Sequence, residues 1–144
     1  MKKLLLSLLA ALVFMGSAEA ATQTHGILTL DVPDGWRVQK DKDVVGFWAP
    51  DNSAGLVTVQ YRVEGTTLKD VAEYLARDVG SNPPVDIGNN WYQLAFRNQH
   101  AGDCYMYVTG NEHSGSYFSM TVPVHLTTHP QIDAMVGSIK LTYP

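Results

Sequence analysis

The feature that most constrains this fold is a two-residue alternation of apolar and polar side chains, broken once in mid-chain by a stretch of helical period. Such alternation predicts strands that bury one face. Turn residues separate the segments that show it, which are 27–32, 36–40, 44–49, 55–63, 91–98, 103–110 and 116–125. The chain is therefore predicted to consist mainly of short strands.

The stretch of helical period covers residues 68–79, where apolar side chains recur along one stripe at three- and four-residue intervals. Thr67 stands at the N-cap position with Asp70 three residues on, and Gly80 follows where a helix end favours left-handed backbone. A second helix is predicted to begin at Pro130, because proline suits the first helical turn. Its apolar stripe consists of Ile132, Met135, Val136 and Ile139.

The last three strand segments are joined by short connectors, which favour antiparallel hairpins. No regular strand–helix–strand alternation accompanies them, so a mainly parallel sheet is not expected. The sequence predicts an α+β fold, with an antiparallel sheet of about six strands flanked by two helices. Cys104, the one cysteine, alternates with Met106 and Val108 and is predicted to be buried.

The first 20 residues have the pattern of a secretory signal peptide. Lys2 and Lys3 precede an apolar stretch at 4–15 and a small-residue cleavage site at Ala18–Ala20. That stretch is shorter than the roughly 20 apolar residues that span a bilayer, so no membrane span is expected. We expect cleavage after Ala20, with residues 21–144 forming one domain in the periplasm or the medium.

Charge argues against a nucleic-acid partner. Without Lys2, Lys3 and Glu19, the 10 basic and 14 acidic residues fall to 8 and 13, which leaves a net charge of −5 with neutral histidines. Phosphate backbones require a basic patch, whereas the basic residues here are scattered among acids.

Sequence motifs for chemistry are weak. His100, His113, His125 and His129 occupy turns and element ends and lack the spacing of a metal site. The nucleophile-elbow pattern is absent, and the serines beside His113 are explained by turn chemistry. We therefore predict no catalytic residue, no metal ligand and no cofactor.

Several segments together resemble the PsbP-like and DcrB-like superfamily: a strand that runs into VPDGW, a strand that ends in WAPDN, a helix introduced by TTLKDVAEYL, a long hairpin and a closing IDAMVGSIKL. The resemblance implies an α/β/α sandwich and an accessory role beside other proteins rather than an enzymatic one. The matching motifs are turns and helix stripes, so no functional residue of the family is carried over.

The candidate interaction face is aromatic. Tyr105, Tyr107 and Tyr117 are predicted to lie opposite the core side of their hairpin strands, with Trp91 and Arg97 on the same side of the neighbouring strand. These residue types dominate interface hot spots. The simpler alternative is that a helix covers this face and the tyrosines are its packing.

The resulting hypothesis is an exported, non-catalytic protein that docks a protein or peptide partner. The alternatives are a periplasmic protein that binds a small ligand or a metal ion and, third, a small hydrolase at the histidine-rich end. An exposed aromatic patch would favour docking of a partner. An internal apolar cavity would favour binding of a small ligand, and polar groups that converge in a pocket would favour a hydrolase.

Overall fold

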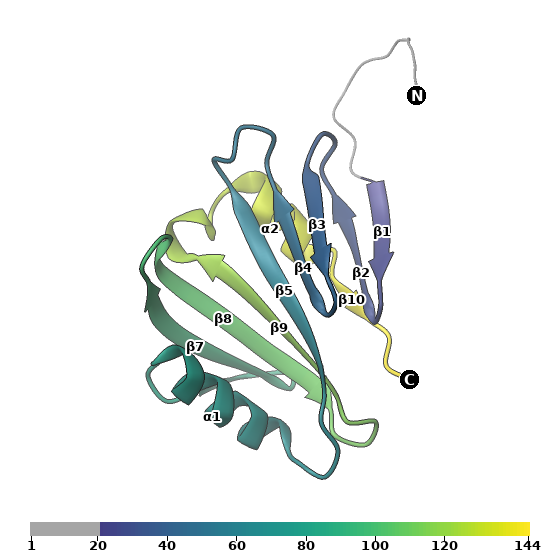
Figure 1. The fold of residues 1–144 in the computed structure, drawn as a ribbon, viewed down its shortest axis with the longest axis vertical. Coiled ribbons are helices and arrows are strands. Elements are labelled where there is room, and N and C mark those ends of the chain that lie inside the picture. Colours follow the sequence, from purple (N-terminus) through teal and green to yellow (C-terminus); the bar gives the residue numbers. More distant parts are fainter. Residues whose placement is uncertain (1–20) are drawn as a thin grey trace.

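Two antiparallel sheets and two α-helices make up the fold in the computed structural model, which describes residues 21–144 (Figure 1). The predicted signal peptide, residues 1–20, lies outside the described residues. The elements in chain order are β1 (Ala21–His25), β2 (Leu28–Val32), β3 (Arg37–Asp41), β4 (Val44–Trp48), β5 (Gly55–Arg62), α1 (Leu68–Val79), β6 (Val85–Gly88), β7 (Trp91–Asn98), β8 (Gly102–Asn111), β9 (Ser116–Pro123), the 3-10 helix η1 (Val124–Leu126), α2 (Pro130–Gly137) and β10 (Lys140–Leu141).

The main sheet has seven strands in the order β3-β4-β5-β9-β8-β7-β6, and a separate three-stranded sheet has the order β1-β2-β10. The α+β class is thus confirmed, whereas the prediction of one sheet of about six strands is corrected. β1, β6 and β10 are short and mostly exposed, so their sequences show little of the apolar alternation that revealed the other strands. The segment predicted to end at His125 leaves the sheet at Pro123.

Helix α1 covers one face of the main sheet, at the end formed by β7 and β8 (Figure 1). Its buried stripe includes Leu68 and Leu75, which pack with Leu94, Met106 and Val108 of the sheet. The predicted caps are confirmed, because the Thr67 side chain accepts a hydrogen bond from the Asp70 N–H and Gly80 adopts φ 70°. We call this side of the sheet the α1 face.

Helix α2 and the small sheet cover the opposite face, which we call the groove face. Leu28 and Leu30 of β2 and Ile132 of α2 belong to the same core as Phe47 and Phe118 of the main sheet. The outer layer on this side is therefore part sheet and part helix, which refines the predicted sandwich.

The β8–β9 register decides which side chains share a face. Tyr107 lies opposite Met120, so Tyr107 is on the groove face, whereas Cys104 and Met106 are on the α1 face. Cys104 is buried as predicted, with 2 % of its surface exposed. Both faces of this hairpin carry apolar side chains because each is covered by a different layer.

Candidate docking groove

An apolar groove of about 480 Å³ lies on the groove face, between the β6–β8 end of the main sheet and α2. Its lining residues are Ile87, Trp91, Tyr107, Met120, Val122, Thr127, Ile132, Asp133, Val136 and Ile139. Of these lining residues, Asp133 is the one that carries a formal charge. The groove can therefore bury apolar groups but offers little for acid–base chemistry.

Trp91 and Tyr107 are the aromatic residues of the groove, and both rings are partly buried. The Trp91 ring meets Phe118 of the core edge to face, with ring centroids 6.4 Å apart. The Tyr107 hydroxyl oxygen accepts a hydrogen bond from Gln93 Nε2 at 3.2 Å. Each ring is thus held by a contact with a neighbouring side chain and also lines the groove, so little side-chain entropy remains to be lost on binding.

The groove has two walls of different origin. Ile132, Val136 and Ile139 form one wall, on α2 and just after it. Ile87 of β6 contributes to the lining from the sheet and is 48 % exposed. Apolar side chains in this position lose contact with water only when something else enters the groove.

The turn between β6 and β7 fixes the position of Ile87. Gly88, Asn89 and Asn90 all have positive φ, which glycine and asparagine tolerate best. Asp86 Oδ1 accepts a hydrogen bond from the Gly88 N–H at 2.9 Å, and Asn90 Nδ2 donates to the Gly110 carbonyl at 2.8 Å. The register shifts between Asp86 and Gly88, so Ile87 lies in a bulge beside the start of β7, and alternation from Val85 directs it to the groove side.

The structure brings most of the predicted interaction residues to one face. Trp91, Arg97, Tyr105 and Tyr107 all lie on the groove face, as the β7–β8 register shows. The Tyr105 ring lies 6.2 Å from that of Tyr107 but outside the groove lining. The predicted face is therefore centred on Trp91 and Tyr107.

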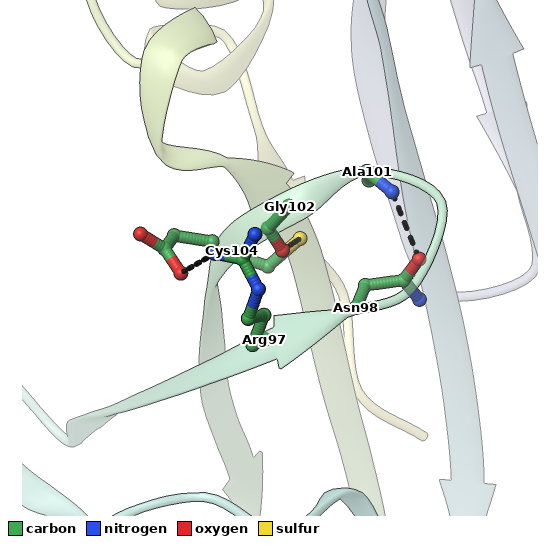
Figure 2. Close-up of polar contacts among 6 residues, drawn as sticks. Arg97, Asn98, Ala101, Gly102 and Cys104 are labelled. Carbon is green, nitrogen blue, oxygen red and sulfur yellow. Dashed lines mark hydrogen bonds and ion pairs between the residues drawn. The ribbon is translucent and has the colours of Figure 1, made fainter.

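Arg97 does not line the groove and lies at the end of the β7–β8 hairpin (Figure 2). Its Nη1 forms an ion pair with Asp103 Oδ1 at 3.0 Å, and both side chains are exposed. Asn98 Oδ1 accepts a hydrogen bond from the Ala101 N–H and closes the same turn (Figure 2). Arg97 therefore belongs to the turn rather than to the groove.

The assignment of Tyr117 to this face is wrong. Tyr117 lies on the α1 face, is 0 % exposed and donates a hydrogen bond from its hydroxyl to the Thr66 carbonyl at 2.9 Å. Burial raises the pKa of the Tyr117 hydroxyl above its usual value. For Tyr117 the simpler alternative is correct, namely that a helix covers the tyrosine ring. The ring packs in the core beneath α1.

Ile87 is not among the residues predicted from the sequence, and Val136 and Ile139 are predicted there as part of the core stripe of the second helix. Val85 and Ile87 do alternate with polar residues just before a turn, and that short alternation is the signal that could have revealed β6. The groove positions of Val136 and Ile139 depend on how α2 sits on the sheet. The sequence carries no separate signal for that placement.

The histidine-rich end has a second pocket of about 450 Å³, lined by His100, Cys104 and His125 among others. Within residues 21–144, no group of three His, Cys, Asp or Glu side chains is arranged to hold a metal ion. Burial raises the pKa of the Cys104 thiol, which favours the protonated form over the reactive thiolate. Among residues 21–144, the side chains at this pocket therefore form neither a three-ligand metal cluster nor an activated thiolate.

Comparisons with known proteins bear on the fold. No protein-family model and no curated protein matches the chain significantly. The solution structure of cyanobacterial PsbP (CyanoP) from Synechocystis sp. PCC 6803 superposes with a TM-score of 0.55 at 16 % identity, covering 93 % of this chain and 99 % of that one.

The chain has a PsbP-like fold. The superposition extends over nearly the whole length of both proteins, so the likeness concerns the fold of the whole domain rather than one part of it. Within residues 21–144, no helix of this PsbP-like fold has the length and apolar character of a membrane span.

Proposed function

We propose that residues 21–144 form an exported, non-catalytic binding domain that docks a protein or peptide partner in the groove between the β6–β8 end of the sheet and α2. The observation that carries the proposal is the groove itself, where the anchored Trp91 and Tyr107 rings lie beside the exposed Ile87. Aromatic rings held in place in this way are typical of interface hot spots.

Export and family relationship are part of the same proposal. The signal-peptide pattern at residues 1–20 supports secretion to the periplasm or the medium. The resemblance to the PsbP-like and DcrB-like superfamily supports an accessory role, and the membership of a DcrB-like branch rests on that resemblance. The net charge of −5 after cleavage makes a partner with a basic surface more favourable than an acidic one.

The size of the groove favours one second candidate. Its volume of about 480 Å³ falls in the range of roughly 300–1,000 Å³ typical of small-molecule sites, so an apolar small ligand is the alternative occupant. Native mass spectrometry of the chain purified from cells that export it distinguishes the two. A bound small mass that Val136→Asp removes would favour the ligand, whereas the bare chain mass favours docking.

Affinity capture with matched tyrosine variants tests the proposal. Tyr107→Ala removes an aromatic ring from the groove, while Tyr74→Ala removes a tyrosine that is 61 % exposed on α1, which covers the opposite face of the sheet. We expect the exported form and Tyr74→Ala to retain the same partner from an extract of the producing cells. Tyr107→Ala should reduce its retention about tenfold or more, as loss of a hot-spot side chain does.

Circular dichroism must first show that both variants are folded. Equal retention by Tyr107→Ala and Tyr74→Ala would contradict a docking site in the groove.

A further inference from the structure

The two edge strands of the main sheet are protected very differently. β3 carries Arg37, Lys40 and Asp41 at exposed positions, and charged edge residues discourage pairing with another chain. β6 is exposed along its whole length, with Val85 at 57 % and Ile87 at 48 %. An edge with exposed apolar side chains beside an apolar groove is suited to accept another strand.

The register assigns each β6 side chain to a face. Val85 lies opposite Gln93, which lies opposite Tyr107, so Val85 is on the groove face. Asp86 lies opposite Tyr92, whose partner Val108 is on the α1 face. A strand added beside β6 would alternate in the same way up to the bulge after Asp86, with every second side chain directed to the groove side.

We propose that β6 accepts an extended segment of another polypeptide as an additional antiparallel or parallel strand, with apolar side chains toward the groove and a basic side chain beside Asp86. The inference deepens the proposed function and rests on it, since it names the form and chemistry of the partner. Main-chain hydrogen bonds to the free edge of β6 supply affinity in this binding mode, and alternate side chains supply selectivity.

Charge selects the occupant. Pairing of β6 with the β6 of a second copy would bring two Asp86 carboxylates close together across the strand pair, and like charges at such positions are destabilising. Asp133 adds a second carboxylate at the groove. Asp86 favours a Lys or Arg on the side of the added strand that faces away from the groove, while Asp133 favours a basic group near the α2 side of the groove.

The length of the added strand is limited on both sides. Pro83 and Pro84 precede β6 and have no N–H to offer, and the turn of positive-φ residues from Gly88 to Asn90 follows it. Pairing therefore extends over at most the four residues of β6, and the Gly88 N–H, which already donates to Asp86 Oδ1, adds no donor to it. Such a short strand depends on the groove contacts for most of its affinity.

The probe is a displayed library of random linear peptides of about twelve residues, selected on immobilised chain 21–144. We expect the enriched sequences to alternate apolar residues with at least one Lys or Arg. Fluorescence anisotropy then gives the affinity of a synthetic peptide and of analogues in which single backbone nitrogens are methylated. N-methylation of the peptide nitrogens that face β6 should weaken binding about tenfold, because it removes a backbone N–H donor and adds bulk at the strand edge. N-methylation of the intervening nitrogens, which face away from β6, should leave the affinity unchanged.

The charge pairing is tested by Asp86→Asn, which keeps an oxygen for the Gly88 N–H but removes the carboxylate. Asp41→Asn at the end of β3, the opposite edge strand, is the matched control. Asp86→Asn should weaken the basic peptide about two- to fivefold, the usual range for an exposed ion pair. Asp86→Asn should not change the affinity for a peptide analogue in which Lys is replaced by Gln. Asp41→Asn should not change the affinity for either peptide.

The outcomes separate the two proposals. Loss of peptide binding in Tyr107→Ala, combined with indifference to N-methylation, would overturn strand addition while leaving the groove as the docking site. Selected peptides that bind Tyr107→Ala as tightly as the unaltered chain would contradict the groove as the docking site. Selection of no peptide, or of acidic peptides, would overturn the strand proposal.

Discussion

At the scale of single residues, two cross-strand pairs of glycine and an aromatic residue set the packing of the sheet. Gly110 lies opposite Tyr117, and Gly55 lies opposite Trp48. A Cβ atom on Gly55 would lie 2.1 Å from Cε3 of Trp48, so the indole occupies the space that a side chain would fill. In both pairs the missing side chain lets a large ring lie against the sheet.

Gly110→Ala should destabilise the fold, because its Cβ would lie 2.3 Å from Cδ1 of Tyr117 and 2.8 Å from the Ser116 carbonyl oxygen. We expect a loss of about 1–3 kcal/mol in the free energy of unfolding, the usual cost of overpacking a core. Urea unfolding measures it. Gly137→Ala is the control, since its Cβ meets nothing within 4 Å, and its stability should be unchanged or slightly increased. Equal stabilities would refute the tight packing of Tyr117.

The error at Tyr117 also belongs to the residue scale. The alternation of Cys104, Met106 and Val108 and that of Phe118, Met120 and Val122 were both readable in the sequence, but the register between the strands was not. When both faces of a hairpin are apolar, alternation divides the side chains of each strand between two faces. It does not show which set on one strand lies on the same face as which set on the other. Gly110 is the one local hint, because a glycine in a strand often marks close packing by a partner.

At the scale of elements, the strongest helix was predictable to the residue because its signals are local. Besides the Thr67 cap, the Glu112 carboxylate on the β8–β9 turn accepts a hydrogen bond from the Leu68 N–H at 2.7 Å. That second contact joins residues far apart in the chain and could not be read from the sequence. α1 is thus fixed at its start both by its own cap and by the hairpin it covers.

Thr67→Ala should lower the free energy of unfolding by about 1 kcal/mol, as loss of an N-cap hydrogen bond usually does. Thermal unfolding followed by circular dichroism measures the change. Thr66→Ala is the neighbouring control, because the Thr66 contact with Tyr117 uses its backbone carbonyl. A loss for Thr66→Ala as large as that for Thr67→Ala would show that the cap is not the cause.

At the scale of the whole molecule, the groove exists because the outer layer on its side is divided. The small sheet and α2 together cover the β4, β5 and β9 part of the core, and side chains of α2 meet the β7 and β8 end of the sheet at the groove. Sequence patterns identify which segments are apolar, and they revealed Trp91 and Tyr107. They do not reveal how far a covering layer extends, because that depends on packing between distant segments.

Site-specific photo-crosslinking tests the central claim, docking in the groove, most directly. A benzoylphenylalanine placed at Ile87, in the groove lining, is compared with one at Tyr74 on α1 in cells that export the chain. Docking in the groove predicts a discrete crosslinked adduct from position 87 that Tyr107→Ala diminishes, and none from position 74. Adducts of equal yield from both positions, or an adduct from position 74 alone, would contradict the groove as the docking surface.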